Sequence, residues 1–297
     1  MTSEAFVFHV DDEPLAGIMH PGKPGARRGV LIVVGGPQYR VGSHRQFLLL
    51  ARHLAQGGIP VMRFDYRGMG DSDGAQRSFE HISQDLRAAV DAFQERTPGV
   101  QEVVVWGLCD AASAALLNAW RDPRITGLVL LNPWVRTEAG LARAYLKQYY
   151  LKRLMSRDFW AGLLGGRVNP LKSARSLVGM ARRALRRQSG QPKGAPGDAP
   201  QVLPEMDPGQ PLPDRMAEGW RRFSGPILLI LSGDDLTAAE FRGCAEQSTV
   251  WRGLLDEDRV TVRELRDANH TFSREAWRQE VAHWTCEWME SSLLRNF

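Results

Sequence analysis

The sequence predicts an α/β fold, with a mostly parallel sheet, helices on both faces and a helical insertion late in the sheet. Short apolar runs alternate with amphipathic stretches in residues 1–135, and the alternation returns in residues 223–297. This pattern is typical of strand–helix–strand units. Polar side chains also follow directly after several apolar runs, where open α/β sheets place their sites. We therefore expect one core, 1–135 with 223–297, interrupted by an insertion at 136–222.

The elements follow as a hairpin and then as strands and helices in turn. Short β-rich runs at 5–10 and 15–20 flank Asp11-Asp12-Glu13-Pro14, which is typical of a hairpin. The apolar run 29–34 stops at Gly35-Gly36-Pro37, as a buried strand ends at a turn. Helices are expected at 44–56, 79–93, 110–120 and 274–294, where apolar residues recur on one face (Ile82, Leu86, Val90 and Phe93; Trp277, Val281, Trp284 and Trp288). The other strands are expected at 59–64, 103–106, 125–131, 226–231 and 260–265.

The strongest motif is Gly107-Leu108-Cys109-Asp110-Ala111, between an apolar strand and a helix of small residues. Its spacing is that of the nucleophile elbow G-x-S-x-G, with Cys109 in place of Ser and Ala111 in place of the last Gly. Small neighbours let strand and helix approach, and the helix N-terminus favours a thiolate and an oxyanion. The alternative is that Cys109 is a buried small hydrophobic residue, as most free cysteines are.

Chain order supports a catalytic triad. In this type of fold the nucleophile, the acid and the histidine follow one another along the chain. Asp234 and Asp235 follow one predicted strand, and His270 follows the next. We expect His270 to act as general base toward Cys109 and then as general acid, and Asp235 to hold the imidazole tautomer. Asp234 is the alternative acid, because an aspartate at this place is also the residue type that caps the helix that follows.

An oxyanion hole needs two N–H donors. We expect one from Asp110, directly after Cys109, and the other from the turn Gly35-Gly36-Pro37-Gln38. Proline has no N–H, so Gly36 is the expected donor and Gln38 the fallback.

These motifs together resemble a known superfamily. Residues 64–72, FDYRGMGDS, resemble the D-x-R-G-x-G-x-S loop of the α/β-hydrolases. Together with the Gly-Gly-Pro turn, the elbow and the Asp and His loops, this resemblance covers the chain outside the insertion. Within the superfamily, the sequence is similar to the group of serine aminopeptidases and lysophospholipases. Residues 35–47, GGPQYRVGSHRQF, and 231–238, LSGDDLTA, resemble the exosortase A system-associated hydrolases, which are encoded near bacterial exopolysaccharide and protein-sorting loci.

The resemblance implies a hydrolase-type enzyme and gives little about the substrate. The sequence departs from the family pattern at two positions. The usual acid stands three residues after the Gly of its motif, where this chain has Leu236, so a one-residue shortening would make Asp235 the acid. The usual His before Gly-Gly-Pro is Val34.

A cysteine nucleophile would form a thioester acyl-enzyme, which transfers readily to amines, alcohols and thiols as well as to water. We therefore expect an esterase or thioesterase, with an acyltransferase as the alternative and a non-catalytic binding protein on a hydrolase fold as a third possibility. Arg40, His44 and Arg67 are candidates to bind a substrate carboxylate, although an arginine at position 67 more often ties its loop structurally.

The insertion is expected to be a basic helical lid. Residues 136–187 look helical and hold 13 Lys and Arg against Glu138 and Asp158, interleaved with large apolar side chains, and residues 189–215 read as a flexible Pro/Gly-rich loop. The simpler interpretation is a lid with an apolar face over the site and a charged face in water. The alternative is a surface that attracts an anionic donor, such as an acyl carrier protein, a coenzyme A thioester or an acidic membrane surface.

Composition narrows the function classes. The net charge is +4, and no nucleic-acid-reading motif accompanies it. The three cysteines, Cys109, Cys244 and Cys286, are too few and too scattered for a disulfide framework. No zinc-ligand pair or Gly-x-Gly-x-x-Gly motif occurs, so we expect neither metal nor cofactor. No apolar run is long enough for a bilayer span, and the N-terminus resembles no signal peptide, so we expect a cytoplasmic protein.

Overall fold

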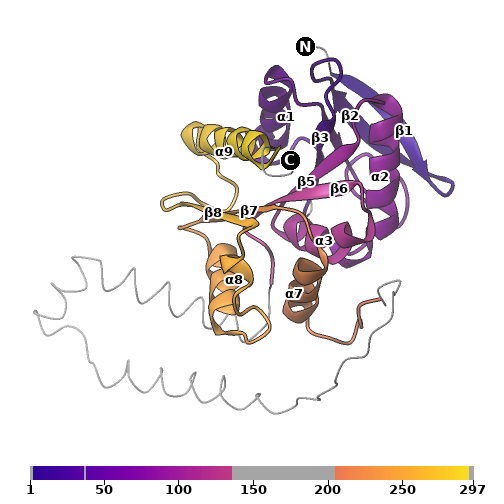
Figure 1. Cartoon of the computed structure of the whole chain (residues 1–297). Helices are drawn as coiled ribbons and strands as arrows, with labels where there is room; N and C mark the ends of the chain where they lie inside the picture. Colours follow the sequence, from indigo (N-terminus) through magenta and orange to yellow (C-terminus); the bar gives the residue numbers. More distant parts are fainter. Residues whose placement is uncertain (1–2, 37, 136–204, 294–297) are drawn as a thin grey trace, which may run out of the picture. The chain divides into compact units, whose positions relative to one another are not determined.

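The computed structural model describes residues 3–36, 38–135 and 205–293. In this part of the chain one sheet has the strand order β1-β2-β4-β3-β5-β6-β7-β8 (Figure 1). The pairs β1–β2 and β2–β4 are antiparallel, and every other pair is parallel. The strands are β1 (Glu4–Val10), β2 (Glu13–His20), β3 (Arg28–Val33), β4 (Val61–Phe64), β5 (Glu102–Leu108), β6 (Ile125–Leu131), β7 (Ile227–Ser232) and β8 (Val260–Leu265). The mostly parallel sheet with an antiparallel edge hairpin is therefore confirmed.

Helices cover both faces of this sheet. The helices α1 (Gln46–Gln56) and α9 (Glu275–Leu293) pack against each other on one face, and α2 (Ser83–Arg96) and α3 (Asp110–Asn118) lie on the other (Figure 1). The helix α8 (Leu236–Gln247) follows β7. The range predicted for the insertion includes α7 (Leu212–Arg222), and this helix packs against α3. Residues 136–204 of the predicted lid lie outside the described residues.

The core below α1 and α9 is built from alternate residues of the central strands. Val30 and Ile32 of β3 and Trp106 of β5 are buried in this layer, as the two-residue period of a strand requires. Phe47 of α1 meets the Trp106 ring edge-on, with 5.6 Å between ring centroids. Trp288 of α9 belongs to the same cluster. The central strands are buried on both faces, which explains why they appear in the sequence as unbroken apolar runs.

Several element boundaries differ from the sequence prediction, three of them as follows. The helix expected from residue 44 begins at Gln46, because residues 43–45 form a 3₁₀ turn in which His44 and Arg45 have φ of 53° and 59°. The helix expected over 79–93 is a 3₁₀ turn followed by α2. The strand expected from residue 59 begins one residue after Pro60, whose nitrogen carries no hydrogen for a ladder bond.

None of the helices in the described part of the chain is long and apolar enough to cross a bilayer. Those same residues also hold no group of three or more His, Cys, Asp or Glu side chains arranged to bind a metal ion.

Candidate active site

Cys109 lies in the tight turn between β5 and α3. Its backbone has φ 63° and ψ −124°, a conformation that costs a non-glycine residue about 1–3 kcal/mol. Its N–H donates to the Leu131 carbonyl at the end of β6, at 2.8 Å. A Cβ at Gly107 would lie 2.7 Å from the Ala111 backbone, so this approach of strand and helix requires a glycine. The strand–turn–helix geometry expected around Cys109 is present.

His270 contacts both of the side chains that the sequence paired with it. Its Nδ1 lies 2.9 Å from Asp235 Oδ2, and the Cys109 side chain also interacts with its imidazole. Burial by itself lowers the pKa of His270, but the hydrogen bonds and charges of Asp235 and Cys109 outweigh it and raise the pKa to about 10. This environment therefore favours an imidazolium at neutral pH.

Asp235, rather than Asp234, is the carboxylate that meets His270. Asp235 is also the N-cap of α8, because its Oδ1 accepts from Thr237 N–H at 3.2 Å and its Oδ2 from Ala238 N–H at 3.1 Å. Asp235 is buried and Asp234 is exposed. The two roles that the sequence divided between two aspartates, capping the helix and orienting the histidine, fall on one.

Two further polar residues, which sequence reasoning did not assign, hold the histidine loop in place. Asn132, fully buried after β6, donates from Nδ2 to Ser232 Oγ at 2.6 Å and to the His270 carbonyl at 3.1 Å. Its Oδ1 accepts from Ser232 N–H at 2.8 Å, and Ser232 Oγ donates to the Asn269 carbonyl at 3.1 Å. The sequence did offer one signal for Asn132, because it is a polar residue that follows an apolar strand, as Asp235 does. However, Asn132 precedes a proline, and an Asn-Pro pair is typical of an ordinary turn.

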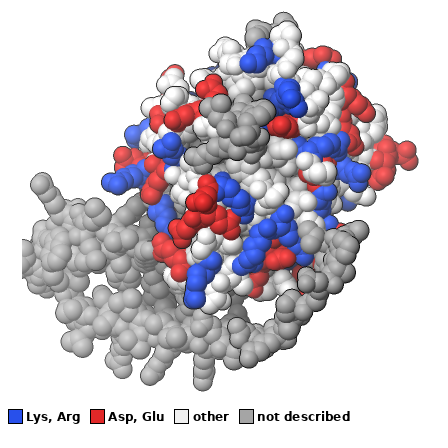
Figure 2. All heavy atoms as spheres, in the orientation of Figure 1, with Lys and Arg blue, Asp and Glu red and all other residues white. Residues whose placement is uncertain are grey.

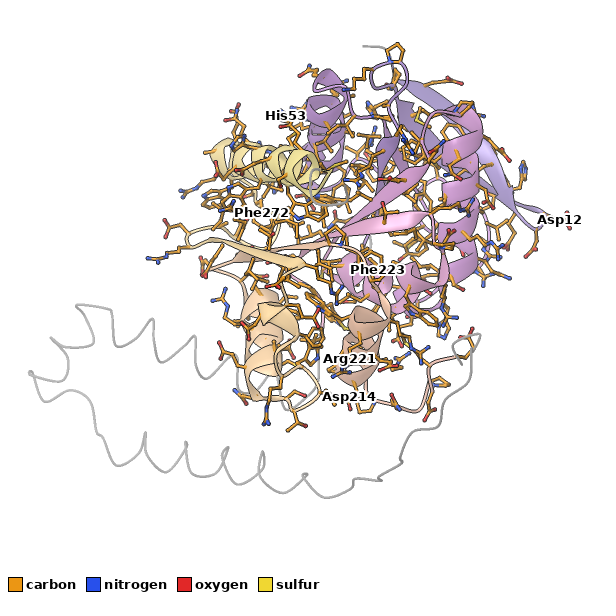
Figure 3. The ribbon with its side chains drawn as sticks, viewed as in Figure 1. Asp12, His53, Asp214, Arg221, Phe223 and Phe272 are labelled. Carbon is orange, nitrogen blue, oxygen red and sulfur yellow. The ribbon has the colours of Figure 1, made fainter. Side chains whose placement is uncertain are left out.

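Phe272 anchors the other side of the same loop. It lies below α9 (Figure 3) and is 1% exposed, within the apolar layer that contains Trp106. Its φ is 48°. The loop that carries His270 is therefore fixed by polar contacts on one side and by a buried ring on the other.

The turn expected to form the oxyanion hole contacts the elbow. Gly36 has φ 62°, which favours glycine, and its N–H donates to Asp110 Oδ2 at 2.7 Å. Gly35 lies so close that a Cβ there would be 2.1 Å from Asp110 Oδ1. Gln38, the fallback donor, uses its side-chain oxygen to accept from Ser43 N–H at 3.1 Å. Pro37 lies outside the described residues. The N–H predicted to stabilise an oxyanion thus already has a carboxylate partner.

Arg40 is engaged by two aspartates close to this turn. Its guanidinium pairs with the buried Asp65, and with Asp71 at 2.7 Å, while its N–H donates to Asp65 Oδ1 at 2.6 Å. His44, the second candidate for a substrate carboxylate, lies in the left-handed 3₁₀ turn before α1. Arg40 thus ties the Gly-Gly-Pro loop to the loop after β4.

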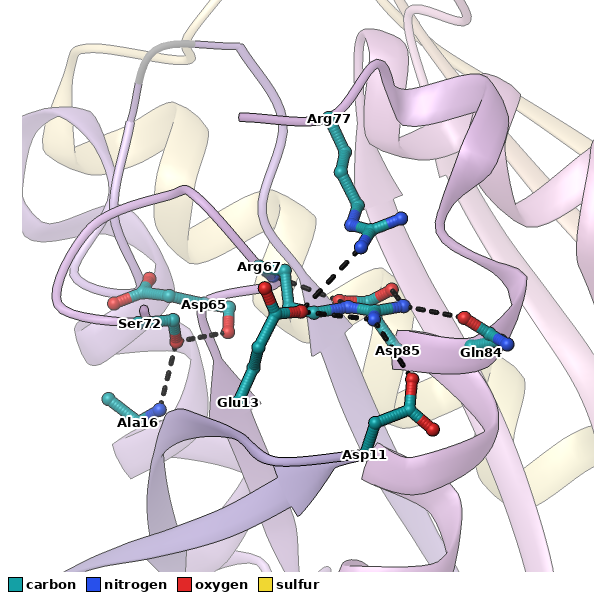
Figure 4. Close-up of polar contacts among 9 residues, drawn as sticks. All are labelled: Asp11, Glu13, Ala16, Asp65, Arg67, Ser72, Arg77, Gln84 and Asp85. Carbon is teal, nitrogen blue, oxygen red and sulfur yellow. Dashed lines mark hydrogen bonds and ion pairs between the residues drawn. The ribbon is translucent and has the colours of Figure 1, made fainter. Parts of the chain in front are cut away.

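Arg67 lies in a buried ion-pair network (Figure 4). It is 2% exposed, and its Nε and Nη2 each lie 3.0 Å from an oxygen of Asp85, which is fully buried. Its guanidinium also contacts Glu13 at 3.1 Å, Gln84 at 2.8 Å and Asp11 at 3.6 Å. These contacts fit the structural role that the sequence left open for Arg67, rather than recognition of a substrate.

The face of the molecule drawn in Figure 2 mixes basic and acidic side chains over the described core. The basic residues at 136–187, which were expected to attract an anionic acyl donor, lie outside the described residues. Attraction of an acyl carrier protein, a coenzyme A thioester or a membrane surface stays a prediction, as does the cytoplasmic location.

Comparison with known proteins adds a family and several relatives. The model of the family described as serine aminopeptidase, S33 matches residues 25–174. Among curated proteins, the polyketide transferase grgF of Penicillium sp. is 27% identical over 117 residues, 38% of this chain and 39% of that protein. The acyltransferase drtE of Aspergillus calidoustus is 25% identical over 137 residues, 45% of this chain and 44% of that protein. The match thus spans less than half the length of either relative.

Solved structures share the fold over nearly the whole chain. An esterase of Pyrococcus furiosus superposes with a TM-score of 0.62 at 15% identity, covering 98% of this chain and 91% of that one. The α/β-hydrolase GrgF of Penicillium sp. superposes with a TM-score of 0.59 at 17% identity, covering 99% of both chains. At these identities the likeness establishes the α/β-hydrolase fold.

Proposed function

This chain belongs to the serine aminopeptidase S33 family of α/β-hydrolases, and on that premise we propose that it is an acyl hydrolase that uses Cys109, His270 and Asp235. Family and relatives support an ester-acting enzyme in general, a hydrolase or an acyltransferase. Cysteine as nucleophile, and thioesters as substrates alongside activated esters, are the finer parts of the proposal.

One observation carries the proposal: His270 Nδ1 lies 2.9 Å from Asp235 Oδ2, and both Asp235 and Cys109 raise the pKa of this histidine. Burial alone would favour a neutral imidazole, yet the two partners raise the pKa of His270 to about 10. A histidine that keeps its proton beside a thiol favours a thiolate–imidazolium pair, which is an activated nucleophile at neutral pH. A merely packed cysteine would not require a histidine oriented by a carboxylate.

The first half of the reaction forms an acyl-enzyme. The Cys109 thiolate attacks the carbonyl carbon of the substrate, and the carbonyl π electrons move to its oxygen. In this proposal the backbone N–H groups of Asp110 and Gly36 stabilise that oxyanion. When the tetrahedral intermediate collapses, the bond to the alcohol or thiol breaks, and His270 gives its proton to the leaving group. The product is a thioester on Cys109.

The second half releases the acyl group. Neutral His270 takes a proton from water as the water oxygen attacks the thioester carbonyl, and collapse expels the Cys109 thiolate. The carboxylic acid leaves, and the imidazolium beside the thiolate is restored. Asp235 holds the tautomer that presents Nε2 to the reacting groups in both halves.

Acyl transfer to another acceptor is the second candidate, favoured by the names of the two curated relatives, a polyketide transferase and an acyltransferase. It uses the same acyl-enzyme and differs only in the group that takes the acyl chain. The two candidates therefore share a first half-reaction and separate in the second.

The test is acylation followed by intact-mass measurement. With p-nitrophenyl acetate and with an acetyl thioester of N-acetylcysteamine, we expect one acetyl adduct, absent from Cys109→Ala and retained in the matched control Cys286→Ala. Decay of the adduct in buffer alone supports hydrolysis, whereas decay that depends on added amine, alcohol or thiol supports transfer. An adduct that persists in Cys109→Ala would refute the proposed nucleophile.

A further inference from the structure

The side chain of Asp110 occupies a place that the proposed reaction needs. Residue 110 was expected to contribute only its backbone N–H, yet its carboxylate reaches across to the Gly-Gly-Pro turn and accepts the Gly36 N–H through Oδ2 at 2.7 Å. The N–H groups of Ala111 and of Asp110 itself also face this carboxylate. An anionic oxygen in contact with these donors stands where a substrate oxyanion would stand.

The Asp110 carboxylate is enclosed by the backbone and side chains around it. Asp110 Oδ1 is buried and makes no hydrogen bond of good geometry to the described residues. It lies against Gly35, where a Cβ would come within 2.1 Å of Oδ1. The buried Tyr66 and the His270 imidazole are the titratable neighbours that interact with it. The pKa of Asp110 is raised overall, because burial outweighs the three N–H groups and His270, which lower it.

We propose that the Asp110 carboxyl group is the resting occupant of the oxyanion hole and must release the Gly36 N–H before acyl transfer. The inference rests on the proposed function, because an oxyanion hole matters only if a carbonyl is attacked at Cys109. A substrate oxyanion and the carboxylate are alike in charge and need the same donor, so they exclude each other. Asp110 thus selects substrates that can displace it, and it acts as a positioning residue rather than a chemical catalyst.

The proposal separates two reactions of the same thiol. Acylation by an ester passes through an oxyanion and requires the donors. Alkylation by iodoacetamide displaces iodide at carbon and forms no oxyanion. Removing the carboxylate changes the charge near Cys109 and so affects both reactions, but only acylation gains from a freed Gly36 N–H. The ratio of the acylation rate to the alkylation rate therefore reports on the occupant alone.

The experiment compares Asp110→Ala, Asp110→Asn and wild type, with Asp12→Ala at the hairpin tip (Figure 3) as the matched control. Acylation is followed as the burst of p-nitrophenol from p-nitrophenyl acetate, and alkylation by intact mass. We expect the ratio to rise roughly 10-fold in Asp110→Ala, the scale of one charge-assisted hydrogen bond. A smaller rise is expected in Asp110→Asn, which keeps a neutral acceptor, and none in Asp12→Ala.

A ratio that stays level or falls in Asp110→Ala would overturn the proposal and make the carboxylate a brace for the turn. Slow alkylation and no burst in wild type would instead reject the proposed function. If the variants do not fold, the amide signal of Gly36 in wild-type protein decides by NMR. The signal should shift as the Asp110 carboxyl titrates. A signal that does not respond would refute the proposal that this carboxyl group occupies the oxyanion hole.

Discussion

Replacing Asp235 by Asn separates the orientation of His270 from the capping of α8. The variant keeps an oxygen for Thr237 N–H, and Asn caps helices about as well as Asp, so the change in helix capping alone should lower the free energy of unfolding by no more than about 1 kcal/mol. We expect a much larger effect on the orientation of His270, and so on turnover. An amide can present its N–H to Nδ1 and so hold the wrong tautomer, an effect that lowers turnover by roughly 10⁴-fold in a serine triad.

The pKa of His270 should fall in the same variant. Burial lowers this pKa, and the hydrogen bond that His270 donates to Asp235 is the largest contribution that opposes burial. With that contribution weakened, the thiolate–imidazolium pair is disfavoured at neutral pH, and alkylation of Cys109 should slow at pH 6–7.

The assay pairs kcat/KM for a p-nitrophenyl ester with unfolding in urea. The neighbouring Asp234→Asn is the matched control, because Asp234 is exposed and is not the carboxylate that meets His270. We expect the control to keep wild-type kcat/KM. The reasoning is refuted if Asp235→Asn retains wild-type kcat/KM, or if Asp234→Asn loses as much as Asp235→Asn does.

Three other outcomes follow from the contacts around the site. Asn132→Ala removes the hydrogen bonds to Ser232 and to the His270 carbonyl, so urea unfolding should show that the free energy of unfolding falls by about 1–3 kcal/mol. We also expect kcat to fall more than KM changes, and an unchanged kcat would contradict a positioning role. Arg67→Ala leaves the Asp85 carboxylate buried without its partner, and the free energy of unfolding should fall by about 3–5 kcal/mol, with unchanged alkylation of Cys109 in the folded fraction; wild-type stability would contradict the buried network. The pKa of His270 is raised in the folded state from 6.5 to about 10, so its contribution to stability is complete below about pH 6.5 and is lost as pH rises toward 10. Thermal unfolding of wild type against His270→Gln over that range should show the difference between them shrinking with pH, and a constant difference would exclude the linkage.

The sheet could be predicted from the sequence because its strands are unbroken apolar runs, each followed by a turn. The same reasoning placed Cys109, Asp235 and His270 after three different strands, and parallel strands bring such positions to one edge. Their meeting therefore follows from topology and needs no knowledge of side-chain conformation.

What could not be predicted depends on side-chain direction. The sequence assigned the Asp110 backbone to the oxyanion hole, but not its carboxylate, because spacing does not show which way a side chain turns at a helix N-terminus. Asn132 escaped notice because its role is a link between strands that are distant in sequence. Arg67 resembled a candidate for substrate binding until its burial against Asp85 was known.

The central claim is that Cys109 is an activated thiolate, and alkylation by iodoacetamide between about pH 5 and 9, read by intact mass, tests it most directly. Burial, with neighbouring carboxylates, raises the pKa of Cys244 to about 11 and raises the pKa of Cys286, so both serve as internal controls. The account predicts one rapid label, on Cys109, below about pH 7, absent in Cys109→Ala and slowed in His270→Ala. Labelling of Cys109 no faster than that of a free thiol would contradict it.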